Sequence, residues 1–364
     1  MLSTVEWGEY KIGELFIPLK GRKKLTKEDL SPDGDVDVYS SDTTNNGIMG
    51  QTELDADYIV DHATPLYLIF GDHTRAMHIA TSDFCVMDNV KVLVPKFKKV
   101  EALLFICSAW QKAIPQLGYC RHWTKAQNMK FFLPTKNGEI DFDFMEKFVA
   151  ELEAQRVAEL EAYLTATGLK DYELTVAEQK ALDDFGSLKW QTFNLEKLFG
   201  KSTRGKRLKS DDRIAGNLPF VTAGEADEGI SAFISNKVEI FEANTTTIDM
   251  FGSAKYRNYK YGADDHVAVV HTEKLSKFAA IFTTAAIHKS SHAGQFDYSR
   301  NFYAKDADEL NISLPVNNNE PDYSAMEVLI SAIQKLIIKD VVLYSDRKIA
   351  ATKQCCNKAS TSAE

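Results

Sequence analysis

The sequence is poor in cysteine, and its cysteines are badly placed for a structural role. The 364 residues include five, Cys85, Cys107, Cys120, Cys355 and Cys356, an odd number without a CxxC pair. A disulfide framework or a zinc site is therefore not expected, and a reducing, cytoplasmic location fits best.

Long hydrophobic runs and an excess of positive charge are also missing. The N-terminus has no apolar signal core, and the longest apolar stretch, residues 328–344, is interrupted by Gln334, Lys335, Lys339 and Asp340. This pattern excludes a membrane span. The formal net charge of −9 argues weakly against a nucleic-acid partner. However, the acids concentrate in expected helices and the bases in expected loops.

Recognisable catalytic motifs are the third absence. The sequence has no phosphate-binding GxxxxGK[ST] loop, no HExxH and no paired Cys/His spacing. An adenine methyltransferase would need an Asn/Asp-Pro-Pro-aromatic loop, and the nearest string, residues 217–220, lacks the first proline. We therefore predict a chain without catalytic residues, bound metal or cofactor of its own.

What the sequence does have is an internal repeat. Trp7 is followed by Leu15-Phe16, and Trp190 is followed at the same spacing by Leu198-Phe199. Further matches, at offsets between about 177 and 184 residues, are Val38-Tyr39-Ser40 with Phe220-Val221-Thr222, Asn46-Gly47-Ile48 with Glu228-Gly229-Ile230, Phe70-Gly71-Asp72 with Phe251-Gly252-Ser253, Asp88-Asn89-Val90 with Asp265-His266-Val267, Leu133-Pro134 with Leu314-Pro315, and Asp141-Phe142 with Asp322-Tyr323. Because the order never breaks, we interpret the chain as two copies of one unit.

Each copy is expected to have a β-rich part followed by a helical part, which makes the fold class α+β. Short apolar runs bounded by turn residues predict strands, for example at 65–70 and 246–250. One short helix per copy is expected at 100–110 and 276–287. The predicted boundaries are 1–140 and 187–319 for the β-rich domains, 141–186 and 320–352 for the helical regions, and 353–364 for a disordered tail.

The helical regions carry apolar residues at three- and four-residue steps, as one face of a helix requires. The second region, from Met326 to Val341, is more apolar all round, so we expect it to be more buried. Between the copies, Thr175 and Glu178 form a capping-box pattern that predicts a further short helix.

Two basic hooks occupy equivalent places in the copies, at 20–24 and 201–209. For one hook alone, a solvated turn would be the simpler interpretation, but its recurrence favours binding to phosphates. The candidate phosphate contacts are Lys20, Arg22, Lys23, Lys24, Lys201, Arg204, Lys206, Arg207 and Lys209.

Polar loops are the second candidate DNA-binding feature. They lie at 40–46, 71–78 and 118–125 in the first copy and at 222–228, 252–260 and 294–301 in the second. Arg and Asn can read guanine and adenine bidentately in the major groove. The scaffold residues match between the copies whereas the loop residues differ, as two readers of different half-sites should. The candidate contacts are Ser41, Thr43, Asn45, Asn46, His73, Arg75, His78, Arg121, Lys125, Lys255, Tyr256, Arg257, Asn258 and Arg300.

On these motifs, together with the helix that continues from residues 141–146 through 151–156, the chain resembles the specificity subunits of type I restriction–modification systems. The resemblance covers nearly the whole chain. It implies two target-recognition domains that each read half of a split site in double-stranded DNA, and spacer helices that pair as an antiparallel coiled coil.

The resemblance also implies partners. The spacer helices dock two modification subunits, which bring S-adenosylmethionine and methylate adenine, and restriction subunits can join. The residues expected to bind these partners are Met145, Phe148, Leu152, Leu160, Met326, Leu329, Ile333 and Leu336.

Other functions remain open at this point. A relative of the family serves bipartite-site type II enzymes of the IIB kind, and the sequence does not separate the two systems. A stand-alone DNA methyltransferase is a further alternative, against which the missing motifs count. A two-domain adaptor or ligand-binding protein without a DNA role is the last.

Overall fold

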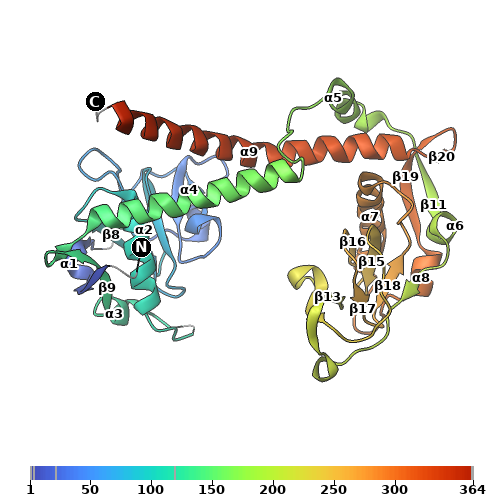
Figure 1. The fold of residues 1–364 in the computed structure, drawn as a ribbon, viewed down its shortest axis with the longest axis horizontal. Coiled ribbons are helices and arrows are strands. Elements are labelled where there is room, and N and C mark those ends of the chain that lie inside the picture. The colour runs from blue at the N-terminus through green and yellow to red at the C-terminus, as the bar shows by residue number, and fades with distance from the viewer. Residues whose placement is uncertain (1, 3–4, 21–22, 119, 362–364) are drawn as a thin grey trace. The chain divides into compact units, whose positions relative to one another are not determined.

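The computed structural model describes residues 2, 5–20, 23–118 and 120–361, with side chains to residue 351. It divides into two compact units, Met1–Leu160 with Lys348–Glu364, and Glu161–Arg347. We describe each unit by itself (Figure 1). In the described part of the chain, no helix is long and apolar enough to cross a membrane.

In the residues that the structure describes, the first unit contains three small sheets. Their strand orders are β1-β9-β10, β2-β8-β5-β6 and β4-β3-β7. The strands are β1 (Glu6–Lys11), β2 (Phe16–Pro18), β3 (Val36–Tyr39), β4 (Ile48–Thr52), β5 (Tyr67–Gly71), β6 (Met77–Ala80), β7 (Phe84–Val86), β8 (Val90–Pro95), β9 (Lys130–Lys136) and β10 (Glu139–Ile140). The helices are α1 (Ile12–Leu15), α2 (Val100–Ala113), α3 (Trp123–Ala126) and α4 (Phe142–Ala166).

The second unit repeats this plan. Its sheets have the orders β11-β19-β20, β12-β18-β15-β16 and β14-β13-β17. The strands are β11 (Trp190–Asn194), β12 (Thr203–Arg204), β13 (Ala215–Val221), β14 (Ile230–Ile234), β15 (Thr245–Asp249), β16 (Ala254–Arg257), β17 (Gly262–Ala263), β18 (Val267–Val270), β19 (Asn311–Asn317) and β20 (Glu320–Pro321). The helices are α5 (Val176–Asp183), α6 (Leu195–Phe199), α7 (Lys277–Ser291), α8 (Ala304–Glu309) and α9 (Tyr323–Thr361). The predicted α+β fold with a duplicated β-rich domain is confirmed.

The strand registers test the repeat residue by residue. Trp7 faces Pro134 and Trp190 faces Pro315, as the sequence match requires. One match is wrong, however. In the first unit, Phe70 of β5 faces Met77 of β6. The equivalent of Met77 in the second unit is Ala254, which faces Ile248 of β15, so the counterpart of Phe70 is Ile248 and not Phe251. The turn after β15 is one residue shorter than the turn after β5, and a chance Phe-Gly pair in that turn produced the false match.

The core of each domain lies between the central four-stranded sheet and one helix. Trp110 of α2 is fully buried against Phe70 of β5, with ring centroids 5.3 Å apart. In the second unit, Ile287 of α7 and Ile248 of β15 belong to the corresponding cluster. Both helices confirm the predicted helical segments.

The long helices follow the domains and contact each other in antiparallel order. In the first unit Lys348 of α9 pairs with Glu153 of α4 at 2.6 Å. In the second unit Ser345 of α9 donates a hydrogen bond to Glu161 of α4 at 3.4 Å. The predicted pairing is confirmed. The helical region was expected to end at residue 352, but α9 runs to Thr361. The expected tail therefore falls partly on this helix and partly, at 362–364, outside the described residues.

Candidate DNA-recognition surfaces

Each domain carries three polar loops next to its central sheet. We call them the turn loop, the hairpin turn and the distal loop: residues 40–47, 72–76 and 114–125 in the first unit, and 222–229, 250–253 and 292–302 in the second.

In the first unit, hydrogen bonds join the three loops into one surface. The Thr74 hydroxyl in the hairpin turn donates to the Ser41 carbonyl oxygen in the turn loop at 2.6 Å. Asp72 binds the distal loop three times. Its carboxylate accepts from the Trp123 amide at 2.6 Å, and its carbonyl oxygen accepts from the amide of the buried His122 at 2.8 Å and lies 3.0 Å from the Nδ1 atom of that ring. The structure therefore brings together loops that are separated by up to about 80 residues in sequence.

The second unit joins its loops through different residues. The Asp249 carboxylate, at the end of β15, accepts from the Gly224 amide of the turn loop at 3.2 Å. The Phe251 ring in the hairpin turn packs edge-on against Tyr298 of the distal loop at 5.1 Å. The Phe302 amide donates to the Met250 carbonyl at 2.9 Å. Asp72 and Asp249 were missed by the sequence analysis, because a single acid after an apolar strand is too common to stand out.

The turn loop has the same unusual backbone in both units. Three consecutive residues with positive φ end it, and the third is a glycine each time. The φ angles are 44°, 50° and 78° for Asn45, Asn46 and Gly47, and 48°, 56° and 80° for Asp227, Glu228 and Gly229. Left-handed conformations cost non-glycine residues of the order of 1 kcal/mol each and cluster at binding sites. In both units the turn therefore presents two exposed polar side chains, which are amides in the first and carboxylates in the second.

His78 and Lys255 hold this turn in place. They occupy the same position of the central sheet, because His78 faces Ile69 and Lys255 faces Thr247. The His78 Nε2 atom lies 2.8 Å from the Asp42 carbonyl oxygen, and its burial lowers the pKa of the ring. Lys255 bonds the Glu225 carboxylate at 3.2 Å. Both were predicted to contact DNA, and both are instead engaged with the turn loop.

Arg257 and Arg75 also differ from their prediction as base-reading residues. Arg257 is 1% exposed, and its guanidinium donates to the hydroxyls of Thr247 and Tyr259, each at 2.9 Å. A side chain enclosed in this way is not available to a base edge, so the expectation for Arg257 is corrected. Arg75 is half-buried and donates to the Ile114 carbonyl at 2.8 Å.

The other predicted loop residues remain on or near the surface. Arg121 lies 3.9 Å from Asp88, Arg300 lies over the Phe296 ring at 5.4 Å, and the Tyr256 hydroxyl donates to Asn244. The exposed predicted residues are Thr43, Asn45, Asn46, Arg121, Lys125, Asn258 and Arg300, and the half-buried ones are Ser41, His73 and Tyr256.

The basic hook of the second unit is largely exposed. The five predicted residues Lys201, Arg204, Lys206, Arg207 and Lys209 all have solvent-exposed side chains. Gly205 lets the hook approach the sheet closely, because a Cβ atom there would lie 1.6 Å from the Ala263 carbonyl oxygen. The hook therefore presents several cations from a backbone that is fixed against β17.

The basic hook of the first unit is only partly free. Lys20 and Lys23 are exposed, and Lys23 lies 3.9 Å from Asp29. Lys24 is half-buried and donates to the Val90 carbonyl at 3.2 Å, and burial lowers its pKa. Arg22 lies outside the described residues.

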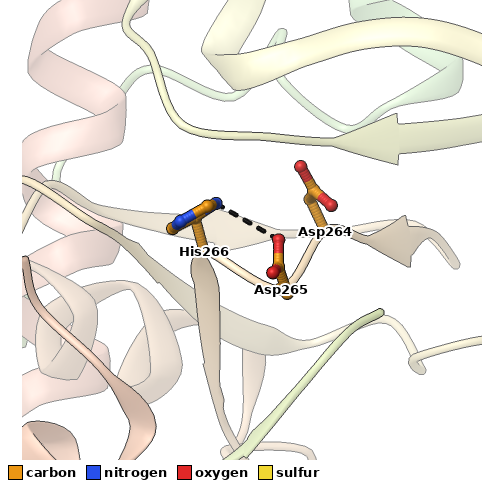
Figure 2. Close-up of side chains that lie close together, drawn as sticks. All are labelled: Asp264, Asp265 and His266. Atoms are coloured by element: carbon orange, nitrogen blue, oxygen red, sulfur yellow. Dashed lines mark ion pairs between the residues drawn. The ribbon is translucent and has the colours of Figure 1, made fainter. Parts of the chain in front are cut away.

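A group of acidic and histidine side chains lies beside the second hook. Among the described residues, Asp264, Asp265 and His266 are the one set whose potential ligand atoms fall within 4.8 Å of one another (Figure 2). His266 pairs with Asp265 at 3.2 Å, and Asp264 accepts from the Leu208 amide at 3.3 Å. The contact of Asp264 attaches the hook to the turn between β17 and β18, which gives this residue a structural role.

The residues predicted to bind partners divide into two classes. Met145, Met326 and Leu329 are at most 2% exposed, and the two methionines belong to the cores of their own domains, so the expectation for them is wrong. Phe148 packs against Phe105 at 5.6 Å, and Leu160 is half-buried. The exposed residues Leu152, Ile333 and Leu336 are 44%, 40% and 48% accessible.

The second helical region is therefore less buried than expected. Ile337 is 73% exposed and Val341 is 38% exposed. Leu329, Ala332 and Val342 of α9 are buried, whereas an apolar stripe on the same helix is exposed, made of Ile333, Leu336, Ile337 and Val341. Such a stripe is typical of a helix that packs against another protein.

A buried ionic cluster, also missed from sequence, fixes the connector to α9. Glu178 of α5 is 6% exposed and accepts from Ser331 at 2.6 Å and from Lys335 at 3.2 Å. These hydrogen bonds outweigh the cost of burial and lower the Glu178 pKa to about 2. The capping box that predicted α5 is confirmed, since Thr175 accepts from the Glu178 amide. It did not reveal that the same glutamate binds α9.

Two domains with the same scaffold, each with polar loops and a basic hook and each followed by a long helix, have the layout of a two-site DNA-recognition protein. Residues 4–162 and 187–343 match the type I restriction modification DNA specificity domain. The chain therefore belongs to this family, and it is a non-catalytic specificity subunit of a restriction–modification system.

Individual relatives agree with this assignment. A protein described as the type II restriction enzyme BgcI specificity subunit S.BcgI, from Heyndrickxia coagulans, is 22% identical over an alignment of 355 residues, which covers 93% of this chain and 97% of the relative. The crystal structure of the type I restriction–modification system S subunit from M. genitalium matches with a TM-score of 0.60 at 14% identity, over 98% of this chain and 95% of that chain. The second likeness shows the fold.

Proposed function

We propose that each domain reads one half of a bipartite, asymmetric site in double-stranded DNA. The basic hooks contact phosphates, and the exposed residues of the turn and distal loops contact base edges. The helices dock two methyltransferase subunits, which carry S-adenosylmethionine and methylate adenine. Restriction subunits are further partners.

One observation carries this proposal. The two domains have identical strand orders and the same left-handed turn, but the side chains on that turn differ in charge. Amides donate and accept hydrogen bonds, whereas carboxylates only accept, for example from the amino group of cytosine. A duplicated scaffold with different donors and acceptors is suited to two different base sequences.

Sequencing of methylated bases tests the proposal directly. The full chain is produced with its methyltransferase in cells that lack other methylation, and methylated adenines are mapped for the wild type, Asn46→Ala and Arg300→Ala. Each variant should relax the sequence of one half-site only, by about 1–3 kcal/mol per base contact. Both variants relaxing the same half-site, or no methylation with the wild type, would contradict the proposal.

The helices give a second test, of the distance between the half-sites. A helix of 25 residues such as α4 spans about 37 Å at 1.5 Å per residue, close to one turn of DNA at about 34 Å. Adding one heptad to both long helices should lengthen the tolerated spacer. An unchanged spacer in the methylation map would contradict the proposal that the long helices set the distance between the half-sites.

The 22% identity to a type II specificity subunit supports the alternative that the chain serves a bipartite-site type II enzyme and not a type I system. Affinity purification of the tagged chain from its native cell, followed by mass spectrometry, separates the two. A methyltransferase in about twofold excess is expected in either case. A separate restriction subunit in the same complex indicates a type I system.

A further inference from the structure

The two units differ where the central sheet leads into its helix. In the first unit, Phe97 follows β8 and fills the space beneath this connection. Its ring lies 5.7 Å from Phe16 and 5.2 Å from Phe142, so that three aromatic rings pack together. Within this group Phe16 is only 1% exposed, and its neighbour Leu15 is only 4% exposed.

The same framework recurs in the second unit without the central ring. Leu198 and Phe199 correspond to Leu15 and Phe16, and Tyr323 corresponds to Phe142. Counting from the sheet register, where Val92 and Val269 are equivalent, Lys274 takes the position of Phe97. The equivalence also agrees with the start of the next helix. The N-cap residue of that helix, Lys99 in the first unit and Ser276 in the second, follows the position of Phe97 or Lys274 by two residues in both units.

A cavity of about 790 Å³ is open at this position in the second unit. Its apolar lining residues are Leu198, Phe199, Leu275 and Tyr323, and its polar lining residues are His271, Thr272, Glu273 and Lys274. Leu198 and Phe199 are half-buried here, whereas their counterparts in the first unit are sealed. We call this cavity the aromatic socket.

Different backbone attachments explain why the socket is open. In the first unit the Lys96 amide donates to the Leu15 carbonyl at 2.9 Å, which draws the segment carrying Phe97 onto α1. In the second unit the segment is attached to the start of β15 instead. The Asn244 side chain donates to the Leu275 carbonyl at 2.7 Å, and the Thr272 hydroxyl donates to the Asn244 carbonyl at 2.8 Å. The rim of the socket is therefore preformed, as in most binding pockets.

We propose that the aromatic socket receives an aromatic side chain from the methyltransferase subunit that docks on the second unit. The first unit shows what this framework accommodates, since the equivalent space holds a phenylalanine ring. Tyr323, on the wall of the socket, is the first residue of α9, the helix whose exposed apolar stripe we assign to that partner. The inference rests on the proposed function and adds an anchor point to it, because a buried aromatic residue in a pocket commonly dominates an interface.

Filling the socket from within the chain tests the proposal. Lys274→Phe should restore the packing of the first unit, raise the Tm by roughly 2–6 °C, and exclude the partner's ring. Native mass spectrometry with the separately purified methyltransferase should then show one bound subunit in place of two, or a loss of affinity at one site of at least about tenfold. Lys237→Phe, an exposed lysine of the same unit outside the socket, is the matched control and should still bind two.

Cross-linking tests the same contact without altering the packing. A photoreactive benzophenone amino acid at position 274 should cross-link to a methyltransferase peptide that contains an aromatic residue, and the same group at position 237 should not. A raised Tm with two subunits still bound, or a fully assembled complex without the cross-link, overturns the socket proposal alone. Failure of the wild-type chain to bind the methyltransferase overturns the proposed function as well.

Discussion

β5 and β15, the central strands of the two domains, have the same place in the fold, but the side chains of β5 are mainly apolar and those of β15 are mainly polar. β5 reads Tyr-Leu-Ile-Phe-Gly and β15 reads Thr-Thr-Thr-Ile-Asp, and every residue of both is buried. In the first domain the strand packs through apolar side chains. In the second domain it bonds through hydroxyls: Thr246 lies 2.6 Å from the Thr284 hydroxyl of α7, and Thr245 lies 2.9 Å from the Tyr261 hydroxyl.

This difference shows that register and turn geometry, not the chemistry of the interior, define the common scaffold. Both strands pair with equivalent neighbours, and each is followed by the hairpin turn of its domain. A buried hydrogen-bond network is stable only while its members are satisfied, whereas an apolar core tolerates loss of single contacts better. We therefore expect the second domain to be the more sensitive of the two to substitutions of buried polar groups.

The largest expected effect is that of Arg257→Ala. It removes the guanidinium that satisfies the Thr247 and Tyr259 hydroxyls and leaves a cavity, which should cost about 3–4 kcal/mol in the second unit. Calorimetry should show one transition about 10 °C lower while the other stays in place. Asn258→Ala, on the exposed neighbouring residue, is the control. An unchanged Tm would mean that the network does not stabilise the domain.

The next largest effect concerns the left-handed turn. A Cβ atom at Gly47 would lie 2.4 Å from the His78 ring, and one at Gly229 would lie 2.8 Å from the Thr222 carbonyl oxygen. Gly47→Ala and Gly229→Ala should each cost about 2–3 kcal/mol and weaken binding of their own half-site at least tenfold.

Gly138 separates backbone strain from the clash. Its φ is 84°, but a Cβ atom there meets nothing within 4 Å. Gly138→Ala should therefore cost only about 1 kcal/mol and leave DNA binding unchanged. Equal losses for Gly138→Ala and Gly47→Ala would show that the contact with His78 contributes nothing.

Sequence reasoning recovered the scaffold because a repeat reports on both copies at once. Gly47 and Gly229 matched in the sequence, and both have the left-handed backbone that selects glycine. Sequence reasoning failed where one copy has a structural feature that the other copy lacks. Arg257 occupies the register position of Ala80, so its burial in a network that the first domain lacks could not be inferred from the repeat. The burial of α9 was overestimated for another reason: composition does not say how many faces of a helix will be covered.

The pH dependence of binding at the first half-site should depend on His78. Desolvation lowers the His78 pKa, so the folded domain favours the neutral ring, although the nearby Asp42 partly opposes this. As the pH falls below about 6.5, the unfolded chain binds a proton that folded His78 resists, and the stability from the neutral ring is lost. Binding of the first half-site should fall roughly three- to tenfold between pH 7.5 and 5.5.

The second domain has no histidine at the same position, because Lys255 takes the place of His78 there. His78→Gln is the control in the first domain, since an amide can still donate to the Asp42 carbonyl and does not titrate. Titration of each half-site duplex with the full chain by fluorescence anisotropy measures both. A fall at the first half-site that persists in His78→Gln would place the titrating group elsewhere.

The smallest expected effect distinguishes the two basic hooks. Lys206→Gln removes an exposed cation of the second hook and should weaken DNA binding a few-fold, for any sequence. It should also reduce the slope of log K against log salt by about 0.9, the contribution of one phosphate contact. Lys24→Gln should leave that slope nearly unchanged, because the Lys24 amine is half-buried and bonded to the Val90 carbonyl. If instead Lys24→Gln reduced the slope as much as Lys206→Gln, the two hooks would contact phosphates equally, and the difference in their burial would have no consequence for binding.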